Sequence, residues 1–204
     1  MRLKNIARWG LAGLLLSSAT LAGVAAAPTV AQDYYGTDGL TIFGGVESDY
    51  RLDYRLFNNT RRNTRAVWAM EVKGTQLQTA TSALVVTLPE SFSRYRGRID
   101  LDEITVRYGR IDSEGEEISI DEVRWDDVVF SGANDLSEEL DKIEIFLAED
   151  VPADTSITIE FNKVRNPNRA LMLRTNLQVF PRGEELATYI GTWEMLVAYE
   201  DRDS

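Results

Sequence analysis

Carboxylates are the most abundant groups in this chain that could do chemistry, and many of them lie in one stretch. Between Asp112 and Asp150 the sequence has fifteen acidic residues and two basic ones. Carboxylates can hold hard cations such as calcium, or act in pairs in glycoside hydrolysis. The chain has no histidine and no cysteine. This excludes Ser-His-Asp triads, thiolate nucleophiles, histidine-bound zinc, and haem or iron–sulfur centres that cysteine would hold.

Residues 112–117 are the best calcium candidate. Asp112, Glu114 and Glu116 alternate with Ser113 and Gly115, in faint resemblance to a calcium-binding loop. The segment lacks both the Asp-x-Asp-x-Asp-Gly spacing and the glutamate at the twelfth position. A hairpin turn after a strand over residues 104–111 explains it equally well. Calcium is the only metal that the composition leaves open, and we expect no other cofactor.

A carboxylate-based hydrolase is the main enzyme class that remains. The adjacent Asp126 and Asp127 would point to opposite faces of a strand, so they cannot flank one bond. Asp100 and Asp102 would share a strand face, but they match no specific motif. There is also no Gly-x-Ser-x-Gly elbow, phosphate loop or dinucleotide-binding glycine motif. We therefore predict that the protein is not an enzyme.

Arginine dominates the basic residues, which gather in groups over residues 51–65, 94–98 and 163–182. Arginine suits bidentate contacts with carboxylate or phosphate. Separate acidic and basic regions can steer partners or favour head-to-tail self-association. Ordinary charged strand faces would look the same in the sequence. The candidate interaction residues are Arg51, Arg55, Arg165, Arg169 and Arg174.

The first 31 residues have the pattern of a secretory signal peptide. Arg2, Lys4 and Arg8 precede an apolar run over residues 9–27, and small residues continue to Ala31. We expect cleavage after Ala31, with Ala27 as the alternative. The competing interpretation is an uncleaved membrane anchor, because a run of about 19 residues reaches the lower end of the spanning range.

Export would leave a strongly acidic protein. The net charge is −11 for the whole chain and −14 after removal of three basic residues with the signal peptide. This charge argues against a nucleic-acid partner, which needs a basic surface. No later segment is apolar enough to span a membrane. We predict an exported protein of the periplasm, cell envelope or extracellular space, whose partner is an unknown protein or glycan.

The rest of the chain, residues 32–204, is predicted to be a single all-β domain. Residues 49–56 alternate strictly between apolar and charged, which is typical of a half-buried antiparallel strand. About ten short strands separated by turns favour an antiparallel β-sandwich, immunoglobulin-like or related, with at most one or two short helices. The best helix candidate is residues 134–141. The expected strands are 40–46, 49–56, 65–72, 83–88, 104–108, 118–124, 142–147, 156–161, 171–180 and 193–199.

Several segments, in this order and spacing, resemble an exported family of cyanobacteria, domain-of-unknown-function family 2808. They are residues 40–46, Leu88-Pro89-x-x-Phe92, Val123-Arg124-Trp125-Asp126, residues 142–147 leading to Val151-Pro152-Ala153, Val164-Arg165-Asn166-Pro167, and Tyr189-Ile190-Gly191-Thr192-Trp193. The resemblance implies a secreted or envelope-associated β-rich protein and brings no catalytic residues or cofactor. The segment after Pro167 departs from the family pattern, because it lacks glycines.

Three functional hypotheses follow. The first is a non-catalytic interaction module of the cell envelope or extracellular space. The second is a calcium- or glycan-binding domain of the same fold, and the third is the carboxylate-based hydrolase. Trp68, Trp125 and Trp193 could stack on sugars, but each lies in a strand-like run, so we expect at least two of them in the core.

Overall fold

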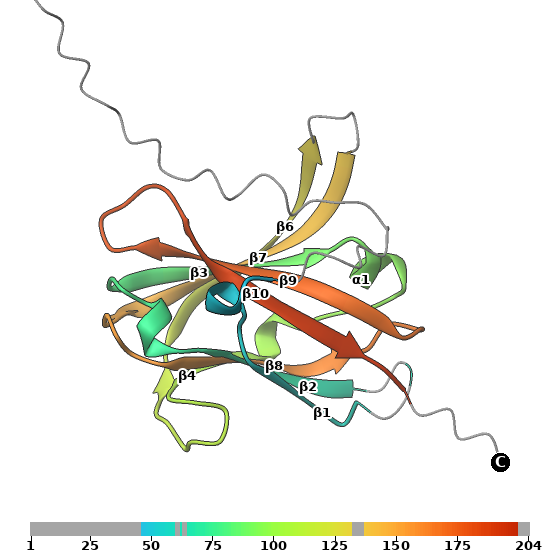
Figure 1. Cartoon of the computed structure of the whole chain (residues 1–204), viewed down its shortest axis with the longest axis horizontal. Coiled ribbons are helices and arrows are strands. Elements are labelled where there is room, and N and C mark those ends of the chain that lie inside the picture. Colours follow the sequence, from blue (N-terminus) through green and yellow to red (C-terminus); the bar gives the residue numbers. More distant parts are fainter. Residues whose placement is uncertain (1–45, 60–61, 63–64, 132–136, 200–204) are drawn as a thin grey trace, which may run out of the picture. The chain divides into compact units, whose positions relative to one another are not determined.

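The computed structural model describes residues 46–59, 62, 65–131 and 137–199. All of them belong to one compact unit, Asp38–Ser204 (Figure 1). The predicted signal peptide lies outside the described residues, and so does the predicted strand at 40–46 apart from the buried Val46.

Ten strands and four short helical segments make up the described part of the chain. The strands are β1 (Tyr54–Phe57), β2 (Arg65–Val72), β3 (Thr81–Pro89), β4 (Ile104–Tyr108), β5 (Glu117–Ile118), β6 (Ile120–Ser131), β7 (Ser137–Val151), β8 (Ile157–Arg165), β9 (Leu171–Pro181) and β10 (Thr188–Val197). The only α-helix there is α1 (Ser91–Arg94), and the 3-10 helices are η1 (Ser48–Tyr50), η2 (Gly74–Gln76) and η3 (Leu101–Glu103). The prediction of an all-β protein with little helix is confirmed.

The strands form two antiparallel sheets of five strands each. One sheet has the order β1-β2-β8-β4-β5, and the other has the order β10-β9-β3-β7-β6. The two sheets form the layers of a β-sandwich (Figure 1). Alternate side chains of both sheets point inward and form one core, because a period of two places successive residues on opposite faces. The predicted sandwich architecture is therefore confirmed.

Two of the three candidate tryptophans lie in this core. Trp68 and Trp193 are fully buried, whereas Trp125 is only partly buried. The indole Nε1 of Trp193 donates to the main-chain carbonyls of Asp53 and Glu71, at 3.1 and 3.2 Å. Both buried tryptophans are therefore structural, as the strand pattern predicted.

Residues 49–56 do not form the single strand that their alternation predicts. Residues 48–50 form η1, Arg51 makes an isolated bridge to Thr192 of β10, and only Tyr54–Phe57 forms a strand, against β2. The segment thus passes from the edge of one sheet to the edge of the other. Leu52, which is 2% exposed, is buried at this crossing. Alternation alone cannot show which sheet each half of such a segment joins.

The helix predicted at residues 134–141 is also wrong for the residues that the structure describes. Ser137–Asp141 belongs to β7 and pairs with Asp127–Ser131 of β6, with Ser131 opposite Ser137. Glutamate and leucine favour a helix only weakly, by tenths of a kcal/mol per residue. Hairpin pairing with β6 outweighs that preference. Residues 134–136 lie outside the described residues.

Candidate functional site

Three arginines stand side by side on neighbouring backbone segments. Arg65 of β2 is the register partner of Arg165 of β8, and Arg165 is in turn bridged to Arg98. In that bridge the Arg98 N–H donates to the Arg165 carbonyl at 3.0 Å, and the Arg165 N–H donates to the Arg98 carbonyl at 2.8 Å. Directly opposed residues of antiparallel segments point to the same face, about 4.8 Å apart. We call Arg65, Arg98 and Arg165 the arginine row.

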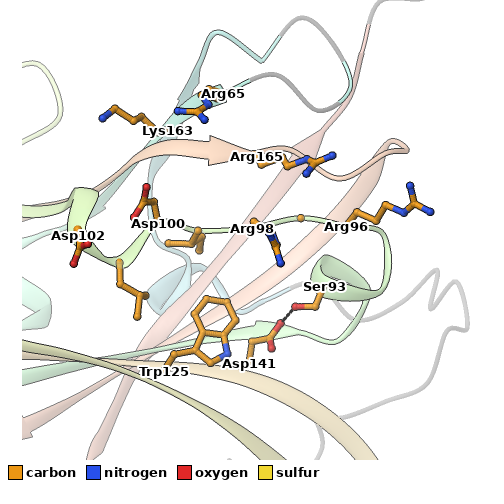
Figure 2. Close-up of a pocket in the computed structure, with 13 residues that line it drawn as sticks. Arg65, Ser93, Arg96, Arg98, Asp100, Asp102, Trp125, Asp141, Lys163 and Arg165 are labelled. Atoms are coloured by element: carbon orange, nitrogen blue, oxygen red, sulfur yellow. Dashed lines mark hydrogen bonds between the residues drawn. The ribbon is translucent and has the colours of Figure 1, made fainter.

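The arginine row lines a hollow of about 1430 Å³. Figure 2 shows the row with Arg96 and Lys163 on one side, and Trp125 with Asp141 on the other. Trp125 and Asp141 come from β6 and β7 of one sheet, whereas Arg65, Lys163 and Arg165 come from β2 and β8 of the other sheet. Residues 96–102 complete the lining. The hollow therefore lies at a margin where both sheets contribute side chains.

The arginines of this hollow have no carboxylate partner among the described residues. Arg65, Arg96, Arg98 and Arg165 make no ion pair and no side-chain hydrogen bond with any of them. Eight other arginines lie within 4 Å of a carboxylate: Arg51, Arg55, Arg94, Arg107, Arg110, Arg124, Arg174 and Arg182. Four arginines that form no ion pair with a described residue thus gather around one hollow.

The remaining charged groups of the hollow are more mixed. Lys163 forms an ion pair with Glu103, and the buried Asp141 accepts a hydrogen bond from the hydroxyl of Ser93. Asp100 and Asp102 are exposed on the lining. The lining therefore has five cations and three carboxylates. The excess of positive charge comes from the arginines.

Two cations of the hollow have a left-handed backbone. Arg96 has φ 66° and follows α1, where its N–H donates to the Ser93 carbonyl at 2.8 Å. The next N–H, of Gly97, donates to the Phe92 carbonyl at 2.9 Å, which completes a helix-ending motif that usually places glycine where Arg96 stands. Lys163 has φ 54°, in β8 where the register with β2 shifts. Such conformations are unfavourable for residues other than glycine, and they concentrate at functional sites.

Asn166 anchors the end of β8 next to the arginine row. It is fully buried, its Oδ1 accepts from the Trp68 indole at 3.3 Å, and its Nδ2 donates to Asn59 Oδ1 at 2.9 Å. The Trp68 ring meets the Phe92 ring edge to face, with centroids 5.4 Å apart. Because Phe92 belongs to α1, this chain of contacts links β2, β8 and the segment that carries Arg96 and Arg98.

Only one predicted interaction residue lies in the hollow. Arg165 belongs to the arginine row, whereas Arg51 and Arg174 both contact Glu194, at 3.1 and 3.3 Å. Arg55 pairs with Asp112, and the Arg169 guanidinium lies 4.0 Å from the centroid of the Tyr95 ring. The sequence showed all three basic groups but not that Arg65, Arg98 and Arg165 are neighbours. Their adjacency depends on strand register, which the sequence does not show.

The calcium candidates form the predicted turn after β4. Asp112 binds both guanidinium nitrogens of Arg55, and Glu114 and Glu116 are exposed. The buried Glu71 accepts a hydrogen bond from Arg110 at 2.8 Å. This hydrogen bond and the negative charge of Glu71 raise the pKa of Arg110 above its usual value. Among the described residues, no three acidic side chains lie close enough together to hold a metal ion. Calcium binding at these candidates stays untested.

The sequence matches a known family model over residues 40–197, a span that includes every residue that lines the hollow. That model describes a protein family of unknown function, DUF2808. The chain belongs to the DUF2808 family. No curated protein matches this DUF2808 sequence.

Solved structures also resemble this DUF2808 chain. The collagen-binding domain of a Staphylococcus aureus adhesin is 8% identical, with a TM-score of 0.37 over 74% of this chain and 97% of the other. The bacterial hydrophobin BslA is 11% identical, with a TM-score of 0.40 over 76% and 98%. An uncharacterised Nocardia farcinica protein with an immunoglobulin-like fold is 12% identical, with a TM-score of 0.34 over 73% and 99%.

The longest α-helix in the described part of the chain has four residues. No helix there is long and apolar enough to cross a membrane.

Proposed function

We propose that this DUF2808 protein is an exported, non-catalytic binding module of the cell envelope or extracellular space, and that the hollow binds an anionic partner. One observation carries the proposal. Arg65, Arg96, Arg98 and Arg165 line one hollow, and none of them pairs with a carboxylate of a described residue.

The physical reason is the cost of like charges in the arginine row. Like charges directly opposite one another destabilise a sheet, by up to about 1 kcal/mol for a pair. Arg65, Arg98 and Arg165 form two such pairs. An anion bound between their guanidinium groups would remove this repulsion and accept charge-assisted hydrogen bonds, which are stronger than those between neutral groups.

Calorimetric titration tests the binding part of the proposal. We expect the mature protein to bind a soluble polyanion, polygalacturonate or dextran sulfate, with an affinity that falls as salt rises. The triple variant Arg65→Gln, Arg98→Gln, Arg165→Gln should lose this binding. The matched control is Arg124→Gln, Arg174→Gln, Arg182→Gln, which makes the same change in net charge at arginines that contact carboxylates elsewhere. Equal loss in both triples would refute a specific site.

Export has its own test. The proposal includes the cyanobacterial origin and the signal peptide over residues 1–31, so we expect a tagged full-length chain in a cyanobacterial host to reach the periplasm or medium. Mass spectrometry of its N-terminus should show cleavage after Ala31 or Ala27. Full-length protein that stays in the cytoplasm would contradict this part.

The alternatives can be separated in the same experiments. A hydrolase would use carboxylates of the hollow, where Asp100, Asp102 and Asp141 all lie. We expect no release of reducing ends from the polysaccharides after long incubation, and release that Asp141→Asn abolishes would overturn the non-catalytic proposal. Heat on titration with millimolar calcium would instead favour a calcium-binding domain.

A further inference from the structure

The hollow has an apolar floor in addition to its charged groups, and binding of a simple anion would not require apolar contacts. This floor consists of Trp125, Ile99 and Leu101, which are all partly buried and all line the hollow. In Figure 2 the Trp125 ring lies on the opposite side of the hollow from Arg65 and Arg165. The geometry points to an acidic polysaccharide as the ligand, a chain of sugar rings that carry carboxylates or sulfates. This inference rests on the proposed function.

The size of the hollow favours a chain over a single ion. Its volume of about 1430 Å³ exceeds the roughly 300–1,000 Å³ of ordinary small-molecule sites. One phosphate or sulfate would fill a small part of it and contact one or two guanidinium groups. The arginine row places its three arginines on neighbouring backbones about 4.8 Å apart, and Figure 2 shows their side chains extending in different directions. Different charged sugars of one chain could therefore contact different arginines.

The apolar floor and the carboxylates also fit a sugar chain. A sugar ring has a face of C–H groups that can lie on an amphipathic aromatic ring such as that of Trp125. Its hydroxyl groups are donors, and the exposed carboxylates of Asp100 and Asp102 are acceptors on the same lining. An inorganic anion such as sulfate has no donor for these two carboxylates. An acidic sugar chain can contact the arginines through its anionic groups and the carboxylates through its hydroxyl groups.

A nucleic acid could also combine stacking with arginine contacts, but its charge density is unfavourable here. Duplex DNA carries one negative charge per about 1.7 Å of helix axis. The whole chain of this protein carries a net charge of −11. A polysaccharide with one acidic group per ring is repelled less by such a protein and still matches the local cations. The observations therefore favour the acidic sugar chain.

The test uses the mature protein and five probes: oligogalacturonate for carboxylated sugars, dextran sulfate for sulfated sugars, neutral dextran, inorganic sulfate and single-stranded oligo-dT. We expect oligogalacturonate or dextran sulfate, or both, to bind at least tenfold more tightly than the other three. Comparison of these two acidic chains identifies which anionic group the hollow takes.

Variants of Trp125 test whether this preference depends on the apolar floor. Trp125→Ala should weaken binding of the acidic sugar about tenfold, within the range of base–aromatic stacking energies, whereas Trp125→Phe should retain most of it. Phe146→Ala is the matched control, because Phe146 belongs to the adjacent strand and packs under Arg124, with its ring centroid 4.8 Å from that guanidinium. Circular dichroism and thermal unfolding check that each variant folds. If Trp125→Ala does not fold, Trp125→Leu takes its place, because leucine keeps an apolar side chain without an aromatic ring and should weaken binding likewise.

Several results would overturn the inference that the ligand is an acidic polysaccharide. If inorganic sulfate or oligo-dT binds as tightly through the arginine row, this inference is wrong, whereas the proposed function as an anion-binding module stands. An unchanged affinity in a folded Trp125→Ala or Trp125→Leu variant would also contradict it. Self-association that the arginine triple variant abolishes would assign the hollow to a second copy of this chain. If no anion binds at all, the proposed function fails together with this inference.

Discussion

The main chains of Arg98 and Arg165 are joined by two hydrogen bonds, one in each direction, of 3.0 and 2.8 Å. This bridge places two like charges beside each other although neither side chain has a carboxylate partner among the described residues. The backbone bridge thus joins two arginines of like charge, an arrangement that is unfavourable in a sheet. Such a relationship has consequences for stability that can be measured without any ligand.

Removal of one charge from the arginine row should stabilise the protein. We expect Arg98→Gln to raise the free energy of unfolding by about 0.5 kcal/mol in low salt. The gain should vanish at molar salt, where the Debye length is about 3 Å. Urea unfolding at both salt concentrations measures it. The control Arg182→Gln breaks a contact of 3.1 Å with Asp150 and should be neutral or slightly destabilising. A gain that does not depend on salt would contradict the electrostatic explanation.

Arg96 should lower the stability of the protein and strengthen its binding of the anionic ligand. Its left-handed backbone, φ 66°, costs an L-residue about 1 kcal/mol relative to glycine. Arg96→Gly should therefore increase the free energy of unfolding by about 1 kcal/mol while it weakens binding of the anionic ligand. Thermal unfolding and calorimetry measure the two effects. Arg96→Gln removes the same charge without relief of the backbone, so it should weaken binding with little gain in stability.

Asn166 should be essential for the stability of the β8 exit. In Asn166→Ala the buried Trp68 indole loses its hydrogen-bond acceptor, which costs about 1–3 kcal/mol. The control is Asn168→Ala, because Asn168 is bonded through its main-chain N–H to the Tyr95 carbonyl, which alanine preserves. We expect that control to change stability by less than about 0.5 kcal/mol. Urea unfolding compares them, and similar losses in both variants would argue against the role of the Asn166 side chain.

Tyr199 should make the protein less stable at high pH. Burial raises its pKa to about 12, although the charge of Arg62 opposes the shift. Between the unfolded value of about 10 and the folded value, the native state binds more protons than the unfolded state, so the free energy of unfolding falls as pH rises. The contribution is fully present below about pH 10. Unfolding measured from pH 9 to 12 should decline less steeply in Tyr199→Phe, and identical slopes would contradict the shift.

Much of the scaffold could be predicted from local patterns. Residues 65–72 and 104–108 form β2 and β4 with the predicted bounds, although β2 is buried along most of its length and only β4 alternates in burial over its first residues. The position of Gly191 was also predictable, because glycine inside a strand pattern indicates a bulge or a close approach. The structure shows both. The register shifts between Tyr189 and Gly191, and a Cβ at Gly191 would lie 2.4 Å from the Tyr50 carbonyl oxygen.

The sequence by itself determined the two-layer β architecture, because strand periodicity and turn residues are local properties that each segment carries with it. It also identified the basic groups that supply Arg65, Arg98 and Arg165. Only the tertiary structure decided that these three residues are neighbours. They are separated by up to a hundred positions in the chain, and their meeting depends on the register of β2 against β8 and on the bridge at Arg98. Register follows from how both sheets bury their core faces together, and a slip of one strand by one residue would turn the arginine of that strand to the opposite face.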